Sequence, residues 1–429
     1  MRLKGFSLSP TKEVGFPTLK RSSLFRWIWY FYTERLTKAG RWFIWPTVMF
    51  IAYGGQSLQI QGYVVFSYLF GIWVVALAAM VLLRPRVVLK VQHAQRVCAG
   101  EIMPVDVDVE QVGRWGGVDL VVLPHRLPGQ VDASPEGGVA VPALKRGEKT
   151  RVRMGLSCPR RGVYTLQGYR IQSDFPFGLL NASQRVVEDR MVMVYPQFTR
   201  LAQLQLPTGR RYHPGGVALA SSLGESFEFI GNREYREGDN IRDIDWRATA
   251  RLCKPIVREY RDEYYLRVAV VLDTHIPKGA KPVVREAFER AVSLGAAISD
   301  YMARQEYLVD LFAAGPNLYH LTAGRSLAYL DQILDILACV KENPEEPFQV
   351  IEPEIMENLS RITTVICVFL DWNAARRDFV DRLRQQGAGV KVVIVRDGEC
   401  TLNPLAEGDL LGPIPVLSQA DFRRGIEEL

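Results

Sequence analysis

The chain has 429 residues, of which 48% are hydrophobic and 23% are charged, and its formal net charge is +6. This composition is that of a folded protein and excludes intrinsic disorder, and the length suggests about three domains. The excess positive charge lies in residues 1–41, which hold nine Lys or Arg and two acids. A basic N-terminal segment favours an anionic membrane surface over nucleic acid as a partner.

Several signatures of cofactor binding and catalysis are missing from the sequence. The six cysteines form no CxxC pair, and no histidine lies at zinc-ligand spacing. The chain also contains no GxxxxGK[ST] phosphate loop, no HExxH or GxSxG motif, and no Ser–His–Asp set. The sequence therefore predicts neither a cofactor nor an enzymatic activity, and free thiols suit a reducing compartment.

Residues 42–83 contain no charged side chain, a length that the core helix of a soluble protein does not need. The arm 63–83 is long enough to cross a hydrocarbon core of about 30 Å. The arm 42–60 starts with twelve clearly apolar residues and reaches spanning length by including the uncharged residues after them. We therefore predict a transmembrane hairpin, 42–60 and 63–83, after a basic and aromatic cytoplasmic or interfacial segment, 1–41.

The charges that flank this hairpin predict its orientation. Arg35, Lys38 and Arg41 precede the apolar run, and Arg84 and Arg86 follow it. The positive-inside rule then places both ends of the hairpin, and both termini of a multi-pass protein, in the cytoplasm. The alternative is a first arm that does not cross, which would place residues 84–429 on the outer side. A cleaved signal peptide is excluded because the run starts late and is too long.

Residues 84–200 combine short alternating segments with frequent turn residues. Apolar and polar residues alternate at 87–91, 105–110 and 192–195, and residues 174–180, DFPFGLL, form a tight aromatic-lined bend. Short strands separated by turn signals are typical of an antiparallel sandwich. We predict an all-β, sandwich-like domain over 84–200.

From residue 266 the chain alternates apolar strands with amphipathic helices, which predicts a largely parallel sheet covered on both faces. We therefore predict that residues 201–265 are a connector that carries a charged motif. Residues 266–429 are predicted to form an α/β three-layer domain. The candidate strands are 265–273, 307–314, 318–323, 363–370 and 390–395, and the candidate helices are 281–305, 326–341 and 374–386.

Two acids follow strands of this sheet, Asp273 and Asp371. Paired carboxylates at the carboxyl ends of strands suit a hard cation, and the arrangement resembles the von Willebrand factor A fold. In that fold the adhesion site has the sequence Asp-x-Ser-x-Ser, but the two serine positions are His275 and Pro277 here. With Thr322 as a loose candidate for the remaining hydroxyl, the site is degenerate, and magnesium is not expected.

The most highly charged part of the chain is residues 233–263, where eight Lys or Arg and eight acids occur among 31 residues. A groove built for phosphates needs a surplus of bases, so this balance excludes nucleic acid. Gly238 is expected to end a turn, and Asn240 to cap a helix with Asp243 reaching back.

This motif resembles the signature of the bacterial family called domain of unknown function fifty-eight. The resemblance extends to the order of parts, with a membrane hairpin, a β domain and an A-type domain, over most of residues 40–400. The motif residues that we expect to carry an interaction are Arg233, Glu234, Tyr235, Gly238, Asp239, Arg242, Asp245, Trp246, Arg251, Arg258 and Glu259.

The resemblance implies a protein of the bacterial inner membrane that works with a MoxR-type AAA+ ATPase. We therefore predict a membrane-anchored, cytoplasm-facing scaffold or adaptor for protein complex maturation or envelope stress functions. The bilayer, and other membrane or envelope proteins, are further expected partners. The alternative is a metal-dependent hydrolase or nuclease that uses Asp239, Asp243 and Asp245. The motif could also serve as a clasp between the two domains that flank it, which is compatible with the adaptor.

Overall fold

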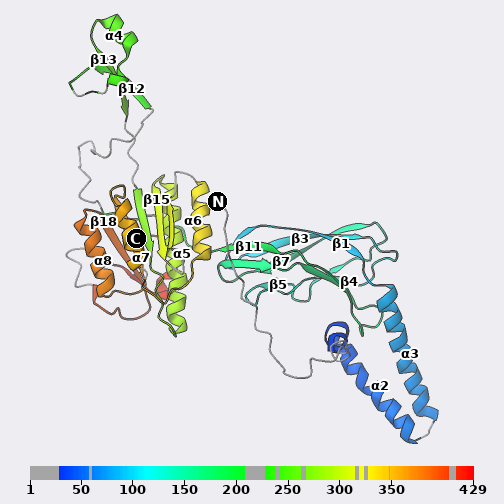
Figure 1. Ribbon diagram of the computed structural model, residues 1–429. Coiled ribbons are helices and arrows are strands. Elements are labelled where there is room, and N and C mark those ends of the chain that lie inside the picture. The colour runs from blue at the N-terminus through cyan, green and yellow to red at the C-terminus, as the bar shows by residue number, and fades with distance from the viewer. Residues whose placement is uncertain are drawn as a thin grey trace. The chain divides into compact units, whose positions relative to one another are not determined.

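The computed structural model describes residues 29–57, 60–207, 228–237, 239, 241–261, 267–314, 318–322, 327–346, 348–404 and 412–429. The chain divides into two compact units, Met1–Val194 and Tyr195–Leu429. Figure 1 shows the elements of each unit.

The first unit begins with a helical hairpin. A π-helix, η2 (Phe31–Arg35), precedes the helices α2 (Lys38–Ser57) and α3 (Ile60–Leu82), which pack against each other. Among the described residues, one helix is long and apolar enough to cross a membrane, the 22-residue stretch Gln61–Leu82, with a hydropathy of 2.4. The predicted second arm is thus present as a candidate span, whereas α2, which includes Lys38 and Arg41, does not meet the same criteria.

The β domain of the first unit is built from antiparallel sheets. Two sheets have four strands each, in the orders β1-β3-β7-β5 and β10-β9-β4-β6, and a third has the order β2-β11-β8. The strands are β1 (Val87–His93), β2 (Arg96–Cys98), β3 (Ile102–Gln111), β4 (Leu120–Pro124), β5 (Asp132–Ser134), β6 (Val139–Val141), β7 (Lys149–Ser157), β8 (Gly162–Leu166), β9 (Tyr169–Ser173), β10 (Ala182–Val186) and β11 (Arg190–Tyr195).

These sheets share one apolar core, as the alternating sequence predicts. Val105, Val107 and Val109 of β3 are fully buried, and they belong to the same cluster as Val122 of β4 and Ile171 of β9. The intervening residues of β3 face outward, because successive side chains of a strand point to opposite faces. The prediction of an antiparallel, all-β arrangement over this stretch is confirmed.

The charged motif forms a small module of its own in the second unit. Its strands β12 (Glu228–Glu234) and β13 (Ile256–Arg261) are antiparallel, with Glu234 opposite Ile256. Between them lie a 3₁₀ turn, η3 (Ile241–Asp243), and the short helix α4 (Trp246–Leu252).

The rest of the second unit is an α/β arrangement around a six-stranded sheet of order β16-β15-β14-β17-β18-β19. All neighbouring strands are parallel except β16, which is antiparallel to β15. The elements are β14 (Arg267–Leu272), α5 (Pro282–Arg304), β15 (Leu308–Ala314), β16 (Leu318–Thr322), α6 (Leu327–Cys339), α7 (Phe348–Asn358), β17 (Thr364–Phe369), α8 (Ala374–Gln385), β18 (Gly389–Val395), β19 (Val416–Leu417) and α10 (Gln419–Arg424).

Helices cover both faces of this sheet. The helices α7 and α8 pack on one face, where Phe348 and Phe379 share a core with Val365 and Ile394. The helices α5 and α6 lie on the other face (Figure 1), where Gly295 of α5 lies against Leu272 of β14. The predicted parallel sheet with two helical layers is therefore confirmed.

Three elements of this α/β arrangement lie outside the sequence-based prediction, α7, β19 and α10. The helix α7 contains Pro353 in its interior, which removes a backbone donor and weakens the helical signal. The strand β19 is only two residues long and pairs with the end of β18, so no periodic pattern identifies it.

Candidate functional site

An Arg–Asp pair holds the turn that follows β12. Arg233 donates two hydrogen bonds to Asp239, at 2.7 Å and 2.8 Å, and the Arg236 backbone N–H donates a third at 2.7 Å. The bidentate guanidinium is the main reason that the pKa of Asp239 falls to about 2. Asp239 is therefore an anion at any physiological pH, and its oxygens are already used by the turn.

Asp245 caps helix α4. Its carboxylate accepts from the backbone N–H groups of Arg247 and Ala248, both at 3.0 Å, and Arg258 lies 3.5 Å away. These donors, the Ala248 amide first, lower the pKa of Asp245. The predicted helix start is wrong: the α-helix begins at Trp246, after a 3₁₀ turn that includes Asp243. Asp245 has the extended backbone and short side chain that an N-cap requires, and Asn240, the predicted cap, lies outside the described residues.

The other motif residues surround this turn and helix. Glu234 pairs with Lys254 at 3.0 Å, and the Tyr235 backbone N–H donates to the Pro255 carbonyl at 2.9 Å. Arg242 and Arg251 are exposed, one in η3 and one in the last turn of α4. Gly238 and the side chain of Glu259 lie outside the described part of the chain.

The module also exposes three large apolar side chains between residues 241 and 252. Ile241 and Trp246 are each 67% exposed, and Leu252 is 58% exposed. Exposed aromatic and aliphatic side chains on an ordered element are typical of protein–protein contact surfaces. The module thus combines a charge network that fixes its own backbone with apolar groups that it does not bury.

The three acids of the alternative metal site do not form a common ligand set. Asp239 is bound by Arg233, and Asp245 is turned toward the amides of α4. No group of three or more His, Cys, Asp or Glu side chains suited to a metal ion occurs among the described residues. The geometry of the module therefore favours ion pairing and capping as the use of these carboxylates.

At the carboxyl edge of the α/β sheet, Asp273 forms a buried ion pair with an arginine. Arg376 donates to one oxygen of Asp273 from Nε at 2.8 Å and from its terminal nitrogen at 2.6 Å. The Leu370 amide donates to the same oxygen, and the His275 amide to the other, each at 3.0 Å. The two side chains are 0% and 2% exposed. The guanidinium thus balances the negative charge of this buried carboxylate.

Asp371 is also fully engaged, at the end of β17. It accepts from the Trp372 amide at 2.8 Å and from the Thr401 amide and hydroxyl at 2.9 Å and 2.6 Å, and Arg396 lies at 2.9 Å. Both sequence-predicted acids therefore lie at the carboxyl ends of neighbouring strands, as expected, but each has protein partners.

The position predicted for the third ligand, Thr322, is wrong. Strand register places Thr322 opposite Asp310, near the amino end of β15, while Asp273 follows the other end of the sheet. Arg376, the partner of Asp273, was not predicted from the sequence. The sequence feature that points to this part of the chain is Asn373, a residue type that often caps helices. Asn373 caps α8 by accepting a hydrogen bond from the Arg376 amide at 3.0 Å, and the helix therefore starts beside Asp273.

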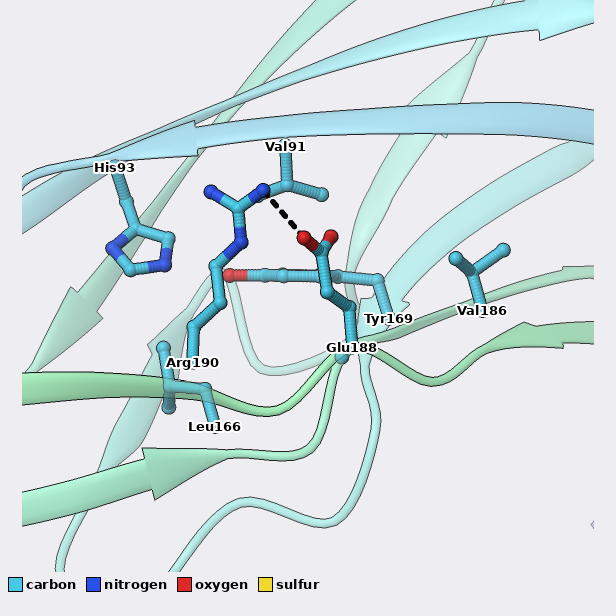
Figure 2. A pocket seen from close by; sticks show the side chains of 8 residues that line it. Val91, His93, Leu166, Tyr169, Val186, Glu188 and Arg190 are labelled. Carbon is cyan, nitrogen blue, oxygen red and sulfur yellow. Dashed lines mark hydrogen bonds and ion pairs between the residues drawn. The ribbon is translucent and has the colours of Figure 1, made fainter.

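A small cavity lies in the β domain of the first unit (Figure 2). Its volume is about 10 Å³, and its lining includes His93, Tyr169 and the ion pair of Glu188 with Arg190 at 2.7 Å. Burial raises the pKa of Tyr169 to about 12, and neither its hydroxyl nor His93 Nε2 has a hydrogen-bond partner among the described residues. A space of this size accommodates one water molecule and not a substrate.

The family comparison covers both sites of the second unit. Residues 231–405 match the model of a family described as "Protein of unknown function DUF58". The match begins in β12 and extends beyond β18, so it includes the charged module, Asp273, Asp371 and Arg376. It supports the family that the motif indicated, and the family description assigns no reaction.

Other comparisons concern smaller parts of the chain. No curated protein matches the sequence. The CARDB domain of a protein from Pyrococcus furiosus is 14% identical, and the match covers 26% of this chain and 94% of that domain, with a TM-score of 0.17. A conjugative transposon lipoprotein from Bacteroides eggerthii is 10% identical over 24% of this chain and 93% of the other, with a TM-score of 0.15. Likenesses this weak do not establish a shared fold.

Proposed function

We propose that this chain is an adaptor anchored in the bacterial inner membrane, which presents its charged module in the cytoplasm to a MoxR-type AAA+ ATPase. The observation that carries the proposal is the module itself. Arg233, Asp239 and Asp245 fix its backbone, while Ile241 and Trp246 remain exposed. Preorganised apolar side chains bind at a lower entropic cost than flexible ones, which suits a docking element.

The membrane anchor is supported by helix α3. Its 22-residue apolar stretch is about 33 Å long at 1.5 Å per residue, and only 6% of its most apolar window is buried within the chain. So much uncovered apolar surface suits a lipid environment. The antiparallel packing of α2 on α3 supports a hairpin with two crossings, and bases at both ends support cytoplasmic termini.

The need for a separate ATPase is supported by the sequence, which has no phosphate-binding loop of its own. The resemblance of the motif implies which class of ATPase this is, and the family match includes the motif. The client would belong to protein complex maturation or to envelope stress functions, as the same resemblance implies.

The α/β unit supports the proposal as a rigid base for docking without a metal. A sheet covered by helices on both faces, with Asp273 directly after β14, is similar to a von Willebrand factor A domain. Because Arg376 fills the place of a cation, docking would depend on protein contacts and not on magnesium.

A pull-down from bacterial membranes in mild detergent tests the adaptor role. We expect the tagged full-length chain to retain an AAA+ ATPase, and Trp246→Ala to lose it. Val187→Ala is the matched control, since Val187 is equally exposed at 67% but belongs to the other unit. Thermal unfolding of both variants shows whether the module stays folded.

Two results would overturn the proposal. One is a pull-down in which the wild-type chain retains no AAA+ ATPase under conditions that keep it folded. The other is turnover of a phosphodiester or peptide substrate that requires magnesium or manganese and is lost with Asp239→Asn, which would favour the hydrolase.

A further inference from the structure

One end of the β domain carries exposed aromatic and basic side chains where the helical hairpin joins it. Strand β1 starts at Val87, five residues after α3 ends at Leu82. Val87 pairs with Gln111, and Glu110 pairs with Lys149, so the turns that follow β3 and precede β7 lie at this same end. In the second sheet, Leu120 pairs with Ser173, which brings the bend after β9 to the same side.

Hydrogen bonds tie these turns to the ends of the helices. The Val112 amide donates to the Arg86 carbonyl at 2.9 Å, and Gln184 exchanges two 2.9 Å bonds with the backbone of Val87. At the other helix, the Thr37 amide donates to the Leu179 carbonyl at 3.2 Å. The segments 35–41, 84–86, 112–118, 144–148 and 174–180 thus form one surface, which we call the rim.

The rim exposes apolar side chains that the domain does not use in its core. Trp115 is 58% exposed, and Phe175 and Phe177 of the bend are 41% and 49% exposed. Val112 and Val118 flank Trp115 and are exposed too. Aromatic residues next to a hydrophobic span are typical of the membrane–water interface, where a ring inserts among the headgroups.

The charge of the rim has the sign that an anionic surface requires. Its five segments contain eight Lys or Arg and two acids. Glu148 accepts a hydrogen bond from the Lys145 amide at 2.8 Å, and the eight bases outnumber the two acids, so the rim keeps a surplus of positive charge. Arg84 and Arg86 also line an open hollow of about 300 Å³, large enough to receive a headgroup.

From this juxtaposition we propose that the rim binds an anionic bilayer surface, with Trp115, Phe175 and Phe177 in the interface and the basic residues on lipid phosphates. The proposal rests on the membrane anchor of the proposed function and extends it, because it makes the β domain a second lipid contact. A domain held by its rim as well as by the helices would keep a fixed orientation on the membrane.

Hydrogen exchange on the full-length chain in nanodiscs tests the rim. We expect the amides of residues 112–118 and 174–180 to exchange more slowly in discs with equal phosphatidylcholine and phosphatidylglycerol than in phosphatidylcholine alone. High salt should remove the difference. The turn at 187–189, at the opposite end of the domain, should exchange equally in both discs.

A pair of matched charge reversals makes the test specific. The rim variant Lys145→Glu with Arg146→Glu should lose the protection, by at least about fivefold for each base that is removed, since each base near an anionic surface contributes about 1 kcal/mol. The control variant Arg126→Glu with Arg160→Glu, at the opposite end, should keep it.

The outcomes separate the rim from the anchor. A chain that stays in the membrane after alkaline carbonate extraction, yet shows the same exchange in both discs, contradicts the rim and leaves the anchor intact. A chain that carbonate extracts contradicts the anchor itself. Protection that persists in the Lys145→Glu, Arg146→Glu variant would also overturn the proposal.

Discussion

Asp273 and Arg376 form an ion pair that is almost completely removed from solvent. Neither charge can be left alone there, because an unpaired buried charge costs far more than the pair contributes. We expect Arg376→Met to lower the free energy of unfolding by about 3–5 kcal/mol. The double variant Asp273→Leu with Arg376→Met should recover most of this loss, as measured by denaturant unfolding in detergent. Equal destabilisation by the single and double variants would show that packing, and not charge, holds this site.

Asp239 provides a second test at the scale of single side chains. Its folded pKa of about 2 lies below the ordinary value of about 3.9. The bonds to the Asp239 carboxylate therefore stabilise the folded turn fully above a pH of about 3.9, and this stabilisation is lost as the pH falls through about 2. We expect Arg233→Gln to raise this pKa, as seen by NMR titration of the carboxyl carbon. Arg236→Gln keeps the backbone donor of residue 236 and should change the pKa much less. Equal shifts in both variants would contradict the bidentate assignment.

The position of a residue could be predicted where it follows from the order of strands and helices along the chain. It could not be predicted where it depends on how one element packs against another. Asp273 and Asp371 follow apolar strands, so their place at the carboxyl edge of the sheet followed from the sequence. The partnership with Arg376 is harder to predict, since Asn373 indicates where α8 starts but not that this start lies beside Asp273. Thr322 was misplaced because β16 is antiparallel, a fact that the sequence pattern of an isolated strand does not contain.

At the scale of elements, helix α2 begins directly against the bend of the β domain. A Cβ added at Gly40 would lie 2.1 Å from the Leu179 carbonyl oxygen, whereas one added at Gly71 of α3 would meet nothing within 4 Å. We expect Gly40→Ala to separate helix and bend and to lower the unfolding temperature. Gly71→Ala should keep or slightly raise it, since alanine favours a helix over glycine by up to about 1 kcal/mol. Equal unfolding temperatures for the two variants would refute the close approach at Gly40.

Helices and strands with a strong pattern of apolar residues could be predicted from the sequence. Those whose bounds depend on contacts with other parts of the fold could not. The strands β14, β17 and β18 are buried on both faces, so they appear as continuous apolar runs. The helix in the charged motif was placed too early, because Asn240, Asp243 and Asp245 are all possible caps and only the fold selects Asp245. The helix α7 was missed because of Pro353, although its apolar residues enter the same core as α8.

At the scale of the whole molecule, the orientation that we propose in the membrane rests on a hairpin with two crossings and on its flanking bases. A reporter that is active only in the periplasm, fused after Leu429, should stay inactive, and a cytoplasmic reporter at the same place should be active. The opposite pattern would mean that α2 does not cross, and would place the second unit outside the cell. Charge and length in the sequence determine this prediction, and among the described residues α3 is the one helix that meets the criteria for a span.

We propose that the charged module is the surface on which a partner docks. A photo-crosslinking amino acid in place of Trp246, introduced into the full-length chain in living bacteria, tests it most directly. We expect a covalent adduct with an AAA+ ATPase, and none from the same group placed at Val187, which is also 67% exposed but lies in the β domain. A crosslinker at position 246 that reaches no ATPase, while the chain remains folded and membrane-bound, would contradict docking of the ATPase on the charged module.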